Sequence, residues 1–211
     1  MISKIKTILQ TLMAVTVILF VGGVWYTVSA EKEETQANLL EKEVEQVVET
    51  LEAISTYTKP DFERENNQTF INSVGECVNY IYNTTTDIYP VNFEILLAQA
   101  ALESGWGNSR FALEGKNLFC MRTYDLREPH MLPSNKPKKW GVKVYQHECD
   151  SVLHYINTLN NGTAFKEYQK LRDDGVTDAI KLLHTLDAYA SDKDYFIKIE
   201  RIINKIKTEY Q

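Results

Sequence analysis

The 211-residue sequence is poor in cysteine, and the number and spacing of its cysteines are not the pattern of a disulfide framework or of paired metal ligands. They are Cys77, Cys120 and Cys149, and neither a C-x-x-C nor an H-E-x-x-H spacing is present. A Cys120–Cys149 bridge stays open if the domain is exported, but buried thiols that pack as small hydrophobic side chains are the preferred interpretation. A zinc site of His147, Cys149 and Cys120 is disfavoured by the spacing. We therefore expect no metal ion and no cofactor.

An excess of basic residues is missing too. The net charge is −6, and residues 1–30, 31–67 and 68–211 carry +2, −7 and −1. The largest of these segments is nearly neutral, so it lacks the basic face that nucleic-acid-binding proteins present. We therefore expect no nucleic-acid partner. An internal repeat or a low-complexity tract is not apparent either.

The longest uncharged run lies near the N-terminus. Residues 7–30 carry no charge and follow Lys4 and Lys6. As a helix this run is long enough to span a bilayer, and it exceeds the apolar region of about 7–15 residues in a signal peptide. Val28-Ser29-Ala30 nevertheless suits a signal peptidase, so cleavage stays open. We predict a signal-anchor in 1–30, with the rest outside the cytoplasm, or a secreted protein if the chain is cut after Ala30.

Residues 31–68 are predicted to form an acidic helical stalk and a linker. Their apolar side chains follow heptad a and d spacing: Leu40, Val44, Val47, Leu51 and Ile54. The seam lasts about two heptads, which is short for a coiled coil. A stalk helix, or one packed on the main domain, is therefore slightly favoured over self-association through residues 40–54. The polar run 63–68 is interpreted as a linker.

Residues 69–211 predict an α+β domain that is mostly helical. Phe93 to Glu103 is apolar nearly all round, which is typical of a buried helix, with Asn92 as its cap and Gly105 as its left-handed end. Residues 118–124 and 140–146 predict a small antiparallel hairpin.

Helices are predicted on both sides of this hairpin. The apolar spacing predicts one before it, over residues 70–81. It predicts further helices near 150–159, 164–172 and 178–183, and a long last helix whose S-x-x-D cap is Ser191 and Asp194.

Glu103 is the candidate catalytic acid. A glycosidase must protonate the leaving oxygen of an acetal, which requires a carboxyl group that is still protonated near neutral pH. Burial and the negative end of a helix dipole both raise the pKa of a carboxyl group, and the predicted position of Glu103 combines them. Trp106 nearby could stack on a sugar ring. From position alone, an ordinary exposed helix-end acid is the more common outcome.

Two runs of residues resemble a known family. The first is 97–109, Leu-Ala-Gln-Ala-Ala-Leu-Glu-Ser-Gly-Trp-Gly-Asn-Ser, followed by Asn117-Leu118-Phe119. The second is Tyr189-Ala190-Ser191-Asp192-Lys193-Asp194-Tyr195 with Lys198-Ile199. In this order they resemble the bacterial peptidoglycan glucosaminidases of the autolysin and flagellar type, also called mannosyl-glycoprotein endo-β-N-acetylglucosaminidase-like domains.

The resemblance implies a lysozyme-like fold and a glycoside hydrolase of the endo-β-N-acetylglucosaminidase type. Its substrate would be peptidoglycan, cut at the β-1,4 bond after N-acetylglucosamine. Glu103 falls on the family's acid and Tyr189 on its active-site tyrosine. Trp106, Asn117 and Phe119 fall on positions that shape the cleft, and Tyr124 is expected to join them in binding substrate.

The resemblance is incomplete in two places. The family usually has glycine after its Asn-Leu-Phe, and here that residue is Cys120. The second carboxylate is also not determined, since Asp125 and Glu128 both lie in the hairpin loop and either could be an ordinary exposed acid. Substrate assistance by the acetamido group is the alternative if neither approaches Glu103.

Two other functions stay in view. A lytic transglycosylase or lysozyme also uses a glutamate before serine, but the Gly-Leu-Met-Gln type of run that usually follows is absent. A non-catalytic wall-binding assembly protein would depend on the anchor and the acidic helix instead. The intact Glu-Ser-Gly-Trp-Gly run favours the enzyme.

Overall fold

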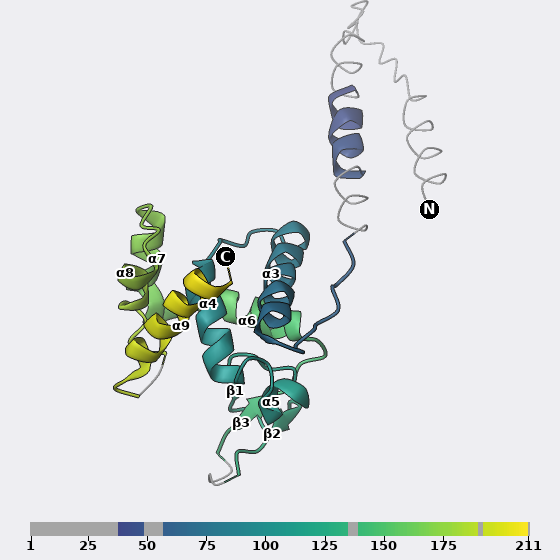
Figure 1. The fold of residues 1–211 in the computed structure, drawn as a ribbon. Coiled ribbons are helices and arrows are strands. Elements are labelled where there is room, and N and C mark those ends of the chain that lie inside the picture. Colours follow the sequence, from purple (N-terminus) through teal and green to yellow (C-terminus); the bar gives the residue numbers. More distant parts are fainter. Residues whose placement is uncertain (1–37, 49–56, 135–138, 190–191, 211) are drawn as a thin grey trace, which may run out of the picture. The chain divides into compact units, whose positions relative to one another are not determined.

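The computed structural model describes residues 38–48, 57–134, 139–189 and 192–210 (Figure 1). The chain divides into two units, Met1–Glu52 and Ala53–Gln211. In the first, residues 38–48 are helical and exposed, as a stalk helix would be. The predicted membrane segment, together with Leu51 and Ile54 of the seam, lies outside the described residues. Within the described part of the chain, every helix is too short or too polar to cross a membrane.

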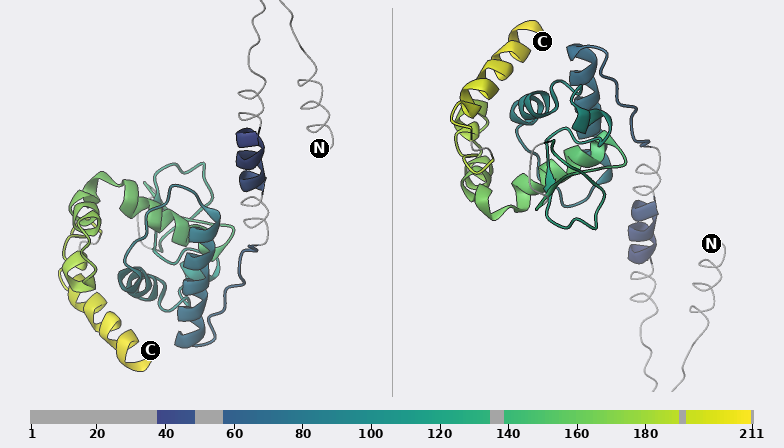
Figure 2. Two further views of the ribbon diagram at one scale, coloured as in Figure 1. Left: turned by 90° about the horizontal axis from the view of Figure 1, so that it is seen from above. Right: turned by 90° about the horizontal axis from the view of Figure 1, so that it is seen from below.

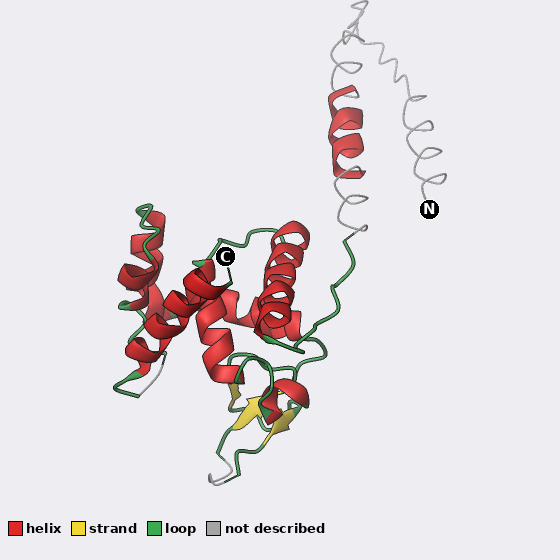
Figure 3. Ribbon diagram, viewed as in Figure 1, coloured by secondary structure: helices red, strands yellow, loops and turns green. Residues whose placement is uncertain are grey.

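The second unit is mostly helical, with one small sheet (Figure 3). Its described elements in chain order are α3 (Asn67–Thr84), α4 (Phe93–Ser104), α5 (Arg110–Leu113), β1 (Arg122–Thr123), β2 (His130–Met131), β3 (Gly141–Lys143), α6 (Glu148–Asn161), η1 (Thr163–Phe165), α7 (Lys166–Asp173), α8 (Ala179–Leu183) and α9 (Tyr195–Glu209). The predicted mostly helical α+β class is confirmed.

Helix α4 lies at the centre of this unit. The Asn92 side chain accepts a hydrogen bond from the Ile95 amide at 3.0 Å, so asparagine caps the helix as predicted. Gly105 ends it in the left-handed conformation, with φ 57°. Helix α4 packs against α9 and α8, and Figure 2 shows α7, α8 and α9 along one side of the unit. Its nearly continuous burial explains why its sequence is apolar on all faces.

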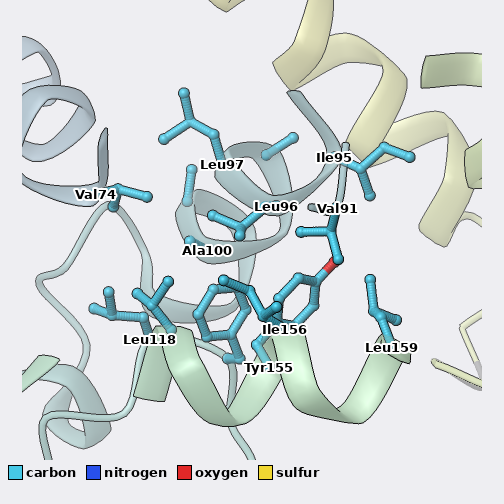
Figure 4. Packing of buried hydrophobic residues seen from close by; sticks show 14 of the residues in the cluster. Val74, Val91, Ile95, Leu96, Leu97, Ala100, Leu118, Tyr155, Ile156 and Leu159 are labelled. Carbon is cyan, nitrogen blue, oxygen red and sulfur yellow. The ribbon is translucent and has the colours of Figure 1, made fainter. Parts of the chain in front are cut away.

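Helices α3 and α6 pack against each other on another side of the core. Leu96 and Ala100 of α4 face Tyr155 and Ile156 of α6 across the hydrophobic core (Figure 4). These side chains are completely buried. The core therefore fixes α4, and with it Glu103, between helices that are distant in sequence.

A disulfide joins Cys77 of α3 to Cys149 of α6. This corrects both interpretations drawn from the sequence. Cys149 does not pair with Cys120, and Cys77 and Cys149 are not free thiols. Cys77 lies on the face of α3 that packs on α6, and only the tertiary packing brings it to Cys149, which is 72 residues away. Closing a loop of that length stabilises a fold by about 4 kcal/mol in the chain-entropy model.

The predicted linker, 63–68, contacts the domain through Arg64, and the residues just before it contact the domain too, so this part of the chain is not a free linker. Phe62 packs edge-on against Phe70, and Lys59 pairs with Asp150 at 2.5 Å. The Arg64 guanidinium pairs with Glu148, which is almost completely buried. The polar residues of this segment are therefore partners for charges on the domain, which composition alone does not reveal.

The sheet has the strand order β1-β3-β2, and both pairings are antiparallel. Arg122 pairs with Val142 in the β1–β3 ladder, so the predicted hairpin partners are confirmed. The pairing is shorter than predicted, and β2 from the proline-containing loop was not expected. Strands of two residues are too short to leave an alternating pattern in the sequence.

The remaining helices match their predicted ranges closely, with one correction at α9. Helix α9 begins at Tyr195, and Asp194 occupies the cap position without a side-chain capping bond. The predicted S-x-x-D cap is therefore wrong as to Asp194, while Ser191 lies outside the described residues. Asp192 pairs with Lys198 instead.

Candidate active site

Glu103 lies in the last turn of α4 and is half-buried. Burial is the main cause that raises the pKa of its carboxyl group. A hydrogen bond from Tyr195, the positive charge of Arg122 and a hydrogen bond from Cys120 oppose this rise without cancelling it. The carboxyl group therefore keeps its proton to a higher pH than an exposed glutamate, which is the property required of a general acid.

The loop after α5 brings Cys120 to Glu103. Cys120 has a left-handed backbone, with φ 51°, and its Sγ donates to the Glu103 carbonyl oxygen at 3.4 Å. Burial, followed by the nearby Glu103 charge, raises the pKa of the Cys120 thiol to about 11. The thiol is therefore protonated at neutral pH and donates a hydrogen to the site rather than acting as a nucleophile.

Two tyrosines extend the site on the side of α9. Tyr189 donates its hydroxyl hydrogen to the Phe119 carbonyl oxygen at 3.4 Å, and its ring stacks on Tyr195 at a centroid distance of 6.0 Å. Burial raises the pKa of Tyr189 well above its usual range, and the Glu103 charge contributes. Tyr189 is thus a neutral hydroxyl near Glu103.

Trp106 makes ring contacts with residues other than Glu103, Cys120 and the two tyrosines. Its ring packs edge-on against Phe70 at 5.9 Å and lies 6.3 Å from the ring of Tyr210. The Lys205 ammonium sits 5.7 Å above the same ring. Trp106 therefore ties α4 to α3 and α9, and stacking on a sugar stays a prediction.

Asn117 and Phe119 act from inside the loop. Asn117 is completely buried, and its amide group donates to the carbonyl oxygens of Met121 and Lys143 at 3.0 and 2.8 Å. Its carbonyl oxygen accepts from the amides of Phe119 and Met121. Phe119 is only 2% exposed and stacks on Tyr155. Such burial does not favour the direct substrate contact that was expected of these two residues; they shape the loop that carries Cys120.

Tyr124, Asp125 and Glu128 lie beside the sheet. Tyr124 is 73% exposed and is free to contact a ligand. Asp125 accepts hydrogen bonds from Arg127, which lower the pKa of its carboxyl group. Glu128 pairs with Lys143 at 3.0 Å and accepts from the Thr123 hydroxyl, and these hydrogen bonds lower its pKa too. Both acids are ionised at neutral pH, but their contacts are with these neighbours and not with Glu103.

A group of potential metal ligands occurs elsewhere, at Cys77, His147 and Cys149, whose ligand atoms lie within 4.8 Å of one another. The two sulfurs are joined in the disulfide, so neither is a thiolate that could bind a metal ion. His147 is engaged at the start of α6, where it accepts from the Cys149 amide. This group serves the α3–α6 packing.

Residues around Glu103 that the sequence had not marked are Gln99, Arg122 and Tyr195. Gln99 lies one turn before Glu103 on α4, a spacing that places both on one face of the helix. Tyr195 stands in the second family-like run, yet only Tyr189 was assigned from it. Arg122 could not be assigned to the site from the sequence, because the pairing of β1 with β3 decides which residue of this region approaches Glu103.

The chain matches a family model described as mannosyl-glycoprotein endo-beta-N-acetylglucosaminidase over residues 79–208. It is 29% identical to the exo-glucosaminidase LytG of Bacillus subtilis (strain 168) over 158 residues, 70% of this chain and 54% of LytG. It is 32% identical to the protein Bax of Escherichia coli (strain K12) over 112 residues, 50% of this chain and 38% of Bax. The chain therefore spans about half or less of these relatives.

Among solved structures, the catalytic domain of the autolysin Auto from Listeria monocytogenes matches with a TM-score of 0.52 and 22% identity. The match covers 88% of this chain and 99% of that domain, and it shows a shared fold. Because the family model covers more than half of the chain, the chain belongs to this glucosaminidase family of glycoside hydrolases. The family predicted from the two sequence runs is confirmed.

Proposed function

We propose that the protein hydrolyses the β-1,4 bond after N-acetylglucosamine in peptidoglycan, with Glu103 as the general acid. The single observation that carries this proposal is the setting of Glu103: a half-buried carboxyl group of raised pKa at the end of α4, with Tyr195 and Cys120 as donors. Such a group can hold a proton near neutral pH and pass it to the leaving oxygen.

We assign the second role, activation of water, to Glu128 rather than Asp125. Thr123 of β1 and Lys143 of β3 hold Glu128, and both contacts keep it ionised as a base must be. Asp125 is held by Arg127 instead, and because the Arg127 side chain is 91% exposed, it fixes the position of Asp125 less firmly. If Glu128→Gln and Asp125→Asn both keep full activity, the substrate's acetamido group takes this role instead.

The test is digestion of purified peptidoglycan with the purified protein, followed by mass spectrometry. The expected products end in reducing N-acetylglucosamine, and large fragments distinguish internal cleavage from the end-wise action that the name of LytG describes. Glu103→Gln should abolish the release. The matched control is Glu114→Gln, which removes an exposed carboxylate from the helical segment that follows.

The same digestion separates the other functions. Anhydro-muramic ends would replace the proposal by a lytic transglycosylase. Binding to the glycan without any turnover would replace it by a wall-binding protein. Release that persists unchanged in Glu103→Gln would overturn the assignment of Glu103 while leaving the hydrolase in place.

We also propose that the catalytic unit works outside the cytoplasm, held by residues 7–30 or secreted. Peptidoglycan lies there, and the Cys77–Cys149 disulfide favours an oxidising compartment. Protease added to intact spheroplasts should digest the catalytic unit. Full protection of that unit, with digestion only after lysis, would contradict this location.

A further inference from the structure

Behind Glu103 lies a chain of hydrogen bonds between buried polar side chains. Gln99 of α4 is completely buried, and its Nε2 donates to the Tyr195 hydroxyl at 2.8 Å. The Tyr155 hydroxyl of α6, also completely buried, donates to Gln99 Oε1. Tyr195 in turn interacts through its hydroxyl group with the Glu103 side chain, which lowers the pKa of Glu103 and raises that of Tyr195. Three helices thus contribute to one relay that ends on the candidate acid.

The hydrogen bonds of this relay all run in one direction. The Tyr155 hydroxyl donates to the carbonyl oxygen of the Gln99 amide, and the NH₂ group of that amide faces Tyr195. Because the Tyr195 oxygen accepts from that NH₂ group, its own hydrogen is free to point at Glu103. One carboxyl oxygen of Glu103 is then occupied, and the other is left to carry the proton that catalysis transfers.

We propose that Gln99 is a positioning residue for catalysis, which directs the Tyr195 hydroxyl hydrogen onto Glu103 and so sets the orientation of the acid. The inference rests on the proposed function in one respect, that Glu103 is the acid. Gln99 itself touches neither substrate nor the reacting atoms. A wholly buried glutamine in a mostly apolar helix is costly unless its hydrogen bonds are made, and here both ends of the amide are used.

Aromatic rings enclose the relay and hold its members in place. The ring of Tyr155 stacks on Phe119 at 4.2 Å and meets Tyr189 edge-on at 5.9 Å. The ring of Tyr189 stacks on Tyr195. In this apolar surrounding a hydrogen bond is stronger than in water, because water does not compete for the donor.

Other titratable and charged groups also face Glu103, and the test must separate them from the relay. They are Arg122 from β1, Cys120 from the loop before it, and Tyr189 and Tyr195 from the side of α9. Of these groups, Tyr195 is the one whose hydroxyl accepts from Gln99. An effect of Gln99 on Glu103 must therefore pass through Tyr195, whereas a general loss of packing need not.

The experiment replaces Gln99 by methionine, which has a similar shape but no amide, in the full protein. We expect kcat/KM on peptidoglycan to fall roughly tenfold, the equivalent of about one lost hydrogen bond. The high-pH limb of the activity profile should move to higher pH, since the Tyr195 hydrogen bond lowers the pKa of Glu103. Carboxyl NMR of the same variant should show Glu103 titrating at higher pH. If neither the high-pH limb of the activity profile nor the Glu103 titration moves in this variant, the proposal is overturned.

A double-mutant cycle provides the decisive control. Tyr195→Phe should move the limb at least as far as Gln99→Met, and the double variant should move it no further, because both changes break one path. A limb shift for Gln99→Met that persists in the Tyr195→Phe background would overturn the proposal. Tyr168→Phe is the matched control: it removes a buried hydroxyl that accepts from the Asn92 amide at the other end of α4, and it should lower stability without moving the limb.

The two readouts also separate this inference from the proposed function. If Glu103→Gln keeps activity but Gln99→Met still moves the Glu103 titration in the NMR spectrum, the relay stands and the assignment of the acid fails. If Glu103→Gln is inactive and neither readout responds to Gln99→Met, the acid stands and the relay fails.

Discussion

Two glutamates of this domain, Glu103 and Glu148, are both withdrawn from water, but the pKa values of their carboxyl groups are shifted in opposite directions. Glu148 is the more buried, with 2% exposure, yet the pKa of its carboxyl group is lowered. Burial is the largest single cause at both sites and raises both pKa values. At Glu148 the hydrogen bonds from Arg64, the backbone and Lys116, together with the charge of Arg64, outweigh it. At Glu103 the hydrogen bond from Tyr195, the charge of Arg122 and the hydrogen bond from Cys120 do not outweigh it.

The partners of a buried carboxyl group, rather than its depth, decide whether its pKa rises or falls. Glu148 receives an ion pair from Arg64 and a second one from Lys116 at 3.2 Å, so it is a permanent anion that ties the segment before α3 to α6. Glu103 receives hydroxyl and thiol donors, which hold a carboxyl group without forcing it to ionise. One site serves stability, and the other is suited to proton transfer.

The largest expected effect is on the rate. Glu103→Gln should lower kcat/KM roughly 10³-fold, the usual contribution of a general acid, with little change in melting temperature. Glu148→Gln, the same chemical change at the other glutamate, should leave the rate per folded molecule unchanged. Both are measured by reducing-end release and normalised to the folded fraction. Equal losses of rate in the two variants would remove the distinction.

The next effect is on folding. Glu148→Gln should lower the free energy of unfolding by about 3 kcal/mol, because it leaves Arg64 partly buried without its anion. Urea unfolding followed by circular dichroism measures this. An Arg64→Gln variant should cost a similar amount, and the pair changed together should cost less than the sum, since each single change leaves the other charge alone.

The pH dependence should have opposite signs at the two sites. The lowered pKa of Glu148 contributes stability above the ordinary glutamate pKa, and this stability is lost as pH falls through the lowered value. The raised pKa of Glu103 means that its contribution is full at low pH and is lost as pH rises through the raised value. Relative to wild type, Glu103→Gln should therefore gain stability at high pH, and the penalty of Glu148→Gln should vanish at low pH. Unfolding curves across pH give both signs.

The smallest effect concerns Cys120. Cys120→Ala removes a weak donor to Glu103, so the high-pH limb of activity should move slightly upward, whereas Cys120→Ser keeps a donor and should restore the limb. The pH–rate profiles of the two variants provide the measurement. A larger shift for Cys120→Ala than for Tyr195→Phe would make the thiol, and not Tyr195, the main partner of the acid.

Much of the fold could be predicted from local patterns. The apolar run of α4, its Asn92 cap and its Gly105 end are properties of a few neighbouring residues, and all three were confirmed. The two-residue strand β2 and the start of α9 were not, because their patterns are too short or are overridden by ion pairs such as Asp192–Lys198. The packing of the segment before α3 was missed because its partners, Asp150 and Glu148, lie more than 80 residues away.

The candidate acid and its family could be found from the sequence by itself, since Glu103 stands in a compact run whose order and spacing are preserved within one helix and its turn. The tertiary structure decided what that acid meets. Packing of α6 and α9 on α4 places Tyr195 against Glu103 and Gln99 behind Tyr195, and the β1–β3 pairing brings Arg122 near it. It also paired Cys77 with Cys149 and left Cys120 beside the acid. The physical reason is that a pKa depends on distance and burial in space, and residues far apart in the chain set both.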